Sequence, residues 1–210
     1  KTKEQNGVEV TDNNLEVLEK CDFIFLTVKP QYYVPVIEGI KDHIKDNQVF
    51  ISIGAGVTLD YLDKAFGGNK VKVIRVMPNT PAQVGEGMSA ACPNEFVSEE
   101  EMKTSLSILS AFGKAEVVPE NLFDVVTGIS GSGPAYVFLF IEALADAAVV
   151  GGMPRRQAYE FAAQTVYGAA KMVMETGKHP GELKDMVCSP AGTTIAAVRT
   201  LEANNFRSAV

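Results

Sequence analysis

The feature that most constrains this 210-residue chain is the apolar run AYVFLFIEALADAAVV at residues 135–150. As a helix, this run has no wide polar face, so other elements must surround it. It contains Glu142 and Asp146 and is shorter than the roughly 20 apolar residues that span a bilayer. The run therefore predicts a buried helix of a soluble protein, and no membrane partner is expected.

The stretch before this helix, TGISGSGP at residues 127–134, consists largely of small residues. Glycine leaves the backbone free to adopt many conformations, and Pro134 suits the start of a helix. The N-terminus of such a helix could also face a phosphate. We favour a flexible loop here that acts as a hinge between two domains.

Strand and helix patterns alternate along the first part of the chain. Three compact apolar runs are typical of strands buried on both faces: residues 23–28, 49–54 and 71–77. Helical patterns follow at residues 34–44 and 58–66, and a third helix starts at Ser98, whose capping box is completed by Glu101. Weaker strand patterns lie at MSAAC and AEVV. The alternation predicts a parallel, doubly wound α/β sheet.

Beyond about residue 124 only helical patterns remain. Four helices are expected, at residues 134–150, 154–175, 180–187 and 191–204. Fewer than 90 residues can scarcely enclose the apolar run, whereas a second copy of the chain could do so through a self-complementary two-fold interface. A helix wrapped by its own α/β half is the alternative. We therefore expect an α/β half over residues 1–124, an all-α half over residues 125–210, and a homodimer.

Composition excludes several classes of partner and site. The formal net charge of −7 and the absence of a basic run argue against nucleic acid and against an anionic membrane surface. His43 and His179 lie far apart and lack the spacing of a metal site. Three widely spaced cysteines predict buried or half-buried thiols in a reducing compartment: Cys21, Cys92 and Cys188. With no signal peptide in the opening residues, the predicted location is the cytoplasm.

Three consecutive strands end in segments that could line a ligand cleft: TVKP (27–30), SIGAG (52–56) and MPNTP (77–81). Open α/β sheets bind ligands outside the carboxyl ends of their strands. Gly54 and Gly56 would let a flat or phosphorylated ligand approach the backbone closely. The glycine-rich G-x-G-x-x-G fingerprint is absent from the sequence, so we expect a strand–helix–strand unit of roughly 30 residues to be missing before Lys1.

A second candidate site lies in CSPAGTTIAAVRTLEANNFR at residues 188–207. Ser189 stands just before a predicted helix start, where free N–H groups of the backbone form an anion site. The hydroxyls of Thr193 and Thr194 add donors and acceptors beside it. The same residues also fit an ordinary N-cap followed by two threonines.

Three stretches closely resemble the pyrroline-5-carboxylate reductase family: GISGSGPAYVFLFIEALADAAVVGGMPR, AAQTVYGAAKMVMETGKHPGELKD and SPAGTTIAAVRTLE. The resemblance implies a Rossmann-type dinucleotide-binding domain at residues 1–124 and a helical dimerisation and substrate-binding domain at residues 125–210. It also implies hydride transfer from NADPH or NADH to 1-pyrroline-5-carboxylate, which gives L-proline. In this family dimers can assemble further into rings of dimers.

The resemblance also assigns individual residues. Asn14 would lie at the adenosine end of the cofactor and Asn79 near the nicotinamide. Four residues would line the cofactor cleft between them: Val28, Lys29, Pro30 and Ala55. The substrate site would comprise Ser189, Gly192, Thr193 and Thr194, with Thr194 near the ring nitrogen as the catalytic residue. Ala191 stands where the family usually has glycine.

Two other functions share part of this pattern. A relative in the wider β-hydroxyacid-dehydrogenase-like group would reduce another C=O or C=N substrate. A non-catalytic dimerisation module would form a stable dimer without affinity for a nicotinamide cofactor.

Overall fold

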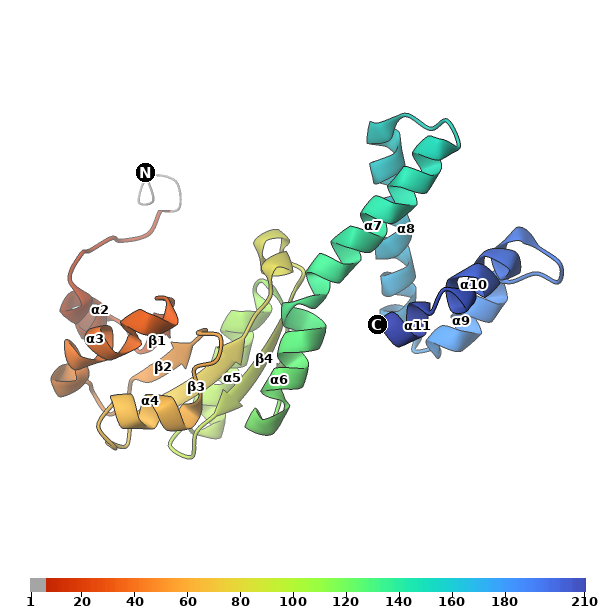
Figure 1. The fold of residues 1–210 in the computed structure, drawn as a ribbon. Helices are drawn as coiled ribbons and strands as arrows, with labels where there is room; N and C mark the ends of the chain where they lie inside the picture. Colours follow the sequence, from red (N-terminus) through yellow and green to blue (C-terminus); the bar gives the residue numbers. More distant parts are fainter. Residues whose placement is uncertain (1–6) are drawn as a thin grey trace. The chain divides into compact units, whose positions relative to one another are not determined.

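A computed structural model describes residues 7–210 of the protein (Figure 1). The chain divides into two compact units, one ending at Tyr136 and the other running from Val137 to Val210.

The first unit is built on a five-stranded sheet whose strands lie side by side in the order of the sequence. The strands are β1 (Phe23–Leu26), β2 (Val49–Ser52), β3 (Lys72–Met77), β4 (Gly87–Pro93) and β5 (Gly113–Val117). All five were predicted, and β1, β2 and β3 pair in parallel, as do β4 and β5. The predicted Rossmann-type α/β class is confirmed.

The pair β3–β4 differs from the predicted parallel arrangement, because these two strands run antiparallel. Only a short 3-10 turn, Thr80–Val84, lies between Met77 and Gly87. A parallel connection needs a crossover of a dozen or more residues, and this segment is too short to make one. The sheet is therefore mixed, with one reversal at β4.

Helices cover the two faces of this sheet. On one face lie α2 (Asn14–Lys20), α3 (Tyr33–Glu38) and α4 (Leu59–Ala65), and on the other lies α5 (Glu99–Ser110). The apolar side chains of each strand alternate between these layers: Phe50 packs with α3 and α4, and Val49 and Ile51 pack with α5. The helix predicted at residues 34–44 is shorter than expected. It ends at Gly39, a poor helix former, and the chain continues in a separate 3-10 turn at Lys41–His43.

The capping box at the start of α5 is confirmed. The Ser98 hydroxyl accepts from the Glu101 N–H, and the Ser98 N–H donates to the Glu101 carboxylate at 2.8 Å. The same carboxylate pairs with Lys72 Nζ at 2.6 Å. Burial alone would raise the pKa of Glu101, but the hydrogen bonds from Lys72 and Ser98 outweigh it and hold this pKa below its ordinary value.

Replacement of Glu101 with glutamine should lower the free energy of unfolding by about 1 kcal/mol near neutral pH, because the charge pair with Lys72 is lost. A carboxyl whose pKa is lowered by folding stabilises the protein above its unfolded pKa of about 4.3. This stabilisation disappears as the pH falls through the pKa that Glu101 has in the folded protein. Urea unfolding of both proteins near neutral pH and at about pH 3.5 checks the prediction. A difference of the same size at both pH values would contradict it.

The second unit is entirely helical, as predicted. It contains most of α7 (Gly133–Val150), followed by α8 (Arg155–Thr176), α9 (Pro180–Val187), α10 (Thr193–Ala203) and α11 (Phe206–Ala209). The small side chains of Ala145, Ala158 and Ala162 form its buried core and let α7 and α8 approach closely. Gly177 ends α8 and Asn205 precedes α11, both in the left-handed conformation expected of caps.

The prediction of a flexible loop at residues 127–134 is wrong, because the segment is helical. It runs from α6 (Phe123–Val126) through a π-helical turn at Thr127–Gly131 into α7. The Thr127 hydroxyl donates to the Phe123 carbonyl and the Ser130 hydroxyl donates to the Val126 carbonyl. These local hydrogen bonds offset the low helix propensity of the glycines. π-Helical turns of this kind are frequent at functional sites.

The other helices of the second unit leave most of the apolar run on α7 exposed. Within residues 7–210, one helical segment, Glu120–Val150, is long and apolar enough to cross a membrane by length and composition. Only 6% of the most apolar stretch of this segment is buried. Leu139 is 67% exposed and Val150 is 90% exposed. The second unit alone thus does not supply the burial that the sequence predicts for this helix.

Candidate active site

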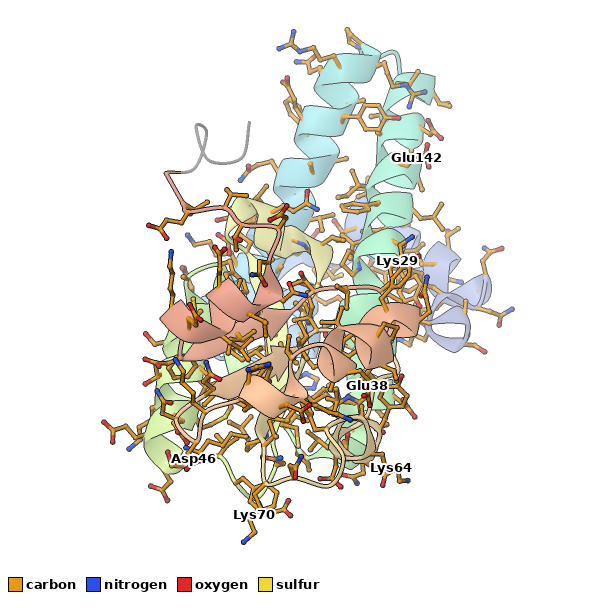
Figure 2. All side chains as sticks on the ribbon, turned by 90° about the vertical axis from the view of Figure 1, so that its left-hand side faces the viewer. Lys29, Glu38, Asp46, Lys64, Lys70 and Glu142 are labelled. Carbon is orange, nitrogen blue, oxygen red and sulfur yellow. The ribbon has the colours of Figure 1, made fainter. Side chains whose placement is uncertain are left out.

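The residues predicted to line a cofactor cleft follow three neighbouring strands. Val28, Lys29 and Pro30 come just after β1, Ala55 comes after β2, and Asn79 comes after β3. The parallel register pairs Leu26 with Ser52 and Ser52 with Arg75. The carboxyl ends of the three strands therefore lie side by side at the same end of the sheet, which we call the carboxyl edge. In Figure 2, Lys29 lies at one end of this unit, and Asp46 and Lys70, which precede β2 and β3, lie toward the other.

A cavity of about 690 Å³ at this edge brings two of the predicted residues together, Asn14 and Val28. The amino-terminal end of α2 supplies one wall, where the Asn13 side chain accepts from the Leu15 N–H at 3.0 Å. The opposite wall belongs to α3 and the turn before it: Tyr32, Pro35, Val36, Gly39 and Ile40. The wall mixes amide and apolar groups, which suits a flat, partly polar ring. Lys29, Pro30, Ala55 and Asn79 do not line this cavity.

Tyr33 links the carboxyl ends of β1 and β2 through hydrogen bonds, a role that the sequence did not indicate. Its buried hydroxyl donates to the Leu26 carbonyl at 2.9 Å and lies 3.0 Å from the Ser52 hydroxyl. A Cβ atom at Gly54 would lie 2.7 Å from the Tyr33 hydroxyl oxygen. Packing against Tyr33 therefore accounts for glycine at position 54, and approach of a ligand to the backbone there stays a prediction. At Gly56, with φ +74°, the space for a side chain is open.

Buried Arg75 and half-buried Glu120 form an ion pair on the face of the sheet that α4 covers. Arg75 on β3 is 6% exposed and donates to the Glu120 carboxylate at 2.8 Å. That carboxylate also accepts from the Leu59 N–H at the start of α4, and the Arg75 guanidinium stacks 4.4 Å from the centre of the Phe123 ring. An arginine within an apolar strand was the only sign of this cluster, because its partner lies 45 residues away.

Of the three cysteines, Cys92 lies beside this cluster. Burial raises the pKa of the Cys92 thiol above its ordinary value, and the nearby Glu120 charge adds to the effect. The thiol is therefore protonated at neutral pH and is a poor nucleophile. Cys92 is buried and Cys188 half-buried, as predicted, whereas Cys21 is exposed.

Asn79 uses its side-chain amide within the protein. Its Oδ1 accepts from the Met88 N–H at 2.8 Å, and its Nδ2 donates to the Ser130 carbonyl at 3.0 Å. Asn79 thus bridges the end of β3, the start of β4 and the π-helical turn.

In the second unit the predicted substrate residues gather at the start of α10. The Gly192 N–H donates to the Ser189 carbonyl at 3.0 Å, which closes a tight turn, and Ala191 within it has φ 58°. Gly192 is the N-cap residue and has no side chain to cap the helix. The first N–H groups of a helix lack intrahelical acceptors, so this end of α10 can hold an anion. In this turn the Ser189 side chain lies next to Gly192, the N-cap residue of α10.

Glycine at position 192 leaves room for the Ser189 hydroxyl in its observed position. A Cβ atom there would lie 2.3 Å from the Ser189 Oγ and 3.1 Å from the Ser189 carbonyl oxygen. By contrast, the left-handed conformation at Ala191 carries a strain of about 1 kcal/mol for a residue with a side chain. The turn thus accommodates alanine where the family usually has glycine.

Comparison with known proteins gives two family matches. A family described as pyrroline-5-carboxylate reductase dimerisation matches residues 120–210. A family described as NADP oxidoreductase, coenzyme F420-dependent, matches residues 1–56.

Individual relatives match nearly the whole chain. It is 54% identical over 207 residues to pyrroline-5-carboxylate reductase of Escherichia coli K12, a match that covers 99% of this chain and 77% of the relative. Identity to the enzyme of Arabidopsis thaliana is 46% over 205 residues, covering 98% and 74%.

Two solved structures share the fold. The pyrroline-5-carboxylate reductase of Coxiella burnetii superposes with a TM-score of 0.91 at 36% identity, over 98% of this chain and 77% of the other. The Plasmodium falciparum pyrroline carboxylate reductase, solved with NADP bound, gives 0.87 at 35% identity, over 98% and 78%.

Proposed function

The chain belongs to the pyrroline-5-carboxylate reductase family, and we propose from this premise that it reduces the C=N bond of 1-pyrroline-5-carboxylate to give L-proline, with NADPH or NADH as the hydride donor. The observation that carries this function is the 54% identity over 207 residues to a curated enzyme of that name. The protein is thus an oxidoreductase of proline biosynthesis. It acts as a homodimer through the segment that matches the dimerisation family, residues 120–210.

The proposed division of labour follows the two halves of the chain. Residues 1–124 bind the dinucleotide, and residues 125–210 form the dimer and bind the substrate. The cavity beside Asn14 and Val28 fits the cofactor's adenosine end, because amide and apolar groups line it together. Three further residues proposed to contact the cofactor follow β1 and β2: Lys29, Pro30 and Ala55. Asn79 follows β3, near the proposed position of the nicotinamide. When bound, the reduced nicotinamide supplies the hydride.

The start of α10 is the proposed substrate site. The Ser189 hydroxyl and the main-chain N–H groups of Thr193 and Thr194 bind the substrate carboxylate. The proposal is supported by the turn, where the Ser189 side chain lies next to Gly192 at a helix N-terminus whose first N–H groups lack intrahelical acceptors. Hydrogen bonds to a charged group contribute about 1.5–3 kcal/mol each, enough to hold a small acid that offers few other contacts.

Thr194 is the proposed catalytic residue, and its hydroxyl orients the ring nitrogen of the substrate. Hydride addition to the C=N carbon is favoured when that nitrogen is protonated. The four proposed substrate residues include no histidine, cysteine or lysine that could act as a strong acid: Ser189, Gly192, Thr193 and Thr194. Catalysis therefore rests mainly on the position of a substrate that is electrophilic once protonated.

The proposal also covers the assembly and the location of the enzyme. Dimers assemble into larger rings, and the protein resides in the cytoplasm without a membrane or nucleic-acid partner. Glu142 and Asp146 lie within the apolar part of α7, which suits a protein interface better than a lipid environment.

The direct experiment follows oxidation of NADPH and of NADH by the purified full chain, with and without 1-pyrroline-5-carboxylate. We expect oxidation that depends on the substrate and yields L-proline. A panel of other C=O and C=N substrates tests the related reductase activity. If the protein binds neither cofactor and remains a stable dimer, it is a dimerisation module instead.

Replacement of Gly192 with alanine should raise KM for 1-pyrroline-5-carboxylate about tenfold, equivalent to about 1.4 kcal/mol of binding. The added Cβ would displace the Ser189 hydroxyl, from which it would lie 2.3 Å. Steady-state kinetics at saturating cofactor checks the effect. As a matched control, Gly168→Ala on α8 adds a Cβ with nothing within 4 Å and should leave KM unchanged. An unchanged KM in Gly192→Ala would remove this turn from the substrate site.

A further inference from the structure

Asn79 and Asn94 bridge opposite ends of the same strand. Asn79 follows β3 and holds the Met88 N–H and the Ser130 carbonyl. Asn94 follows β4 and holds the Val73 N–H, at 3.2 Å, and the Val71 carbonyl, at 2.8 Å, beside the beginning of β3. Both side chains are half-buried, and each uses its amide as acceptor and donor at once. The two residues differ in which carbonyl group accepts the hydrogen bond that they donate.

The donor group of Asn79 reaches the π-helical turn. Ser130 lies within Thr127–Gly131, where main-chain bonds run from residue i+5 to residue i, as from the Ser132 N–H to the Thr127 carbonyl at 2.8 Å. The Asn79 amide supplies a donor to the Ser130 carbonyl from outside the helix. The turn continues directly into α7, so the bridge ties the carboxyl end of β3 to the beginning of the helical segment.

We propose that Asn79 is a positioning residue of the reductase, which acts by holding the π-helical turn at the cofactor edge and not by binding the cofactor itself. The inference rests on the proposed function and defines how Asn79 serves it from its place near the nicotinamide. Two of the amide's hydrogen bonds are already made inside the protein, so the side chain is fixed in place before any ligand arrives. A shift of about 1 Å in such a support can cost a hundredfold in rate.

The test replaces Asn79 with aspartate, which has the same shape. The carboxylate still accepts from Met88 but cannot donate to the Ser130 carbonyl, and it repels that oxygen. We expect kcat for 1-pyrroline-5-carboxylate to fall about tenfold, while Kd for NADPH, from fluorescence titration, stays within about twofold. The protonated carboxyl is a donor, and the nearby Ser130 carbonyl oxygen raises the pKa of this carboxyl, so the ratio of variant to wild-type kcat should rise as the pH falls from about 7 to about 5.

Asn94→Asp is the matched control, because it makes the same change in an equivalent bridge at the other end of β3. Its thermal stability should fall as much as that of Asn79→Asp, with kcat within about twofold of wild type. Should Asn79→Asp fail to fold, Asn79→Ala replaces it and should show the same fall in kcat with an unchanged Kd for NADPH, but no recovery at lower pH.

The possible outcomes separate the inference from the function. Unchanged kcat in Asn79→Asp, an equal loss of kcat in Asn94→Asp, or a weaker Kd for NADPH as the only effect would overturn the positioning role. A wild-type protein that does not reduce 1-pyrroline-5-carboxylate would overturn the proposed function instead.

Discussion

Leu139→Glu is expected to convert the dimer into monomers and to reduce reductase activity more than a hundredfold. Leu139 is 67% exposed on α7, whereas Ala145, on another side of the same helix, is buried against α8. Burial of a leucine side chain in an interface contributes about 2 kcal/mol, and burial of an unpaired carboxylate there costs several kcal/mol more. Sedimentation velocity and steady-state activity at the same protein concentration measure both effects.

The control for Leu139→Glu makes a similar change away from the dimerisation segment. Val117 on the edge strand β5 is 54% exposed and precedes residue 120, where the family match begins. Val117→Glu should remain dimeric and active. A fully active dimer of the Leu139→Glu variant would show that this face of α7 is not part of the interface.

Thr194→Ala is expected to lower kcat/KM for 1-pyrroline-5-carboxylate about a hundredfold, the loss typical of one hydrogen-bonding group that acts in the transition state. Thr194 is half-buried in the first turn of α10, which is the proposed anion site. Steady-state kinetics with saturating NADPH measures the change. Most of the loss should appear in kcat if Thr194 orients the ring nitrogen during hydride transfer.

Two further variants separate the Thr194 hydroxyl from the stability of α10. Thr194→Ser keeps the hydroxyl and should retain most of the activity. Thr200→Ala removes a hydroxyl that donates to the Ala196 carbonyl farther along the same helix, and it should leave kcat/KM unchanged. If Thr194→Ala itself keeps the wild-type kcat/KM, Thr194 has no part in the mechanism.

The secondary structure was largely predictable because its signals are local. Buried strands and caps depend on neighbouring residues, as at Ser98 and Glu101, and α9 was predicted at its observed bounds. The reversal at β4 was also encoded locally, in the short connection after Met77, but the alternating pattern around it favoured a parallel sheet. The π-helical turn was missed because glycine-rich segments usually form loops, whereas here two hydroxyls hydrogen-bond the preceding carbonyls.

The internal supports of the candidate site could not be predicted, because they join distant residues. Glu120 meets Arg75 across 45 positions, and Asn79 meets Ser130 across 51. No periodicity or motif in the sequence indicates that two such distant residues are in contact. The strand ends and the start of α10 were predictable, because parallel strands align their carboxyl ends and helix starts carry free donors.

The central measurement compares kcat/KM for 1-pyrroline-5-carboxylate with that for 1-pyrroline, which lacks the carboxylate, in the wild-type dimer and in Ser189→Ala. If the turn before α10 grips the acid group, the wild-type enzyme prefers the carboxylated imine at least about a hundredfold, and loss of the Ser189 hydroxyl removes about tenfold or more of that preference. Equal values for the two imines in the wild-type enzyme, or an undiminished preference in Ser189→Ala, would contradict this assignment.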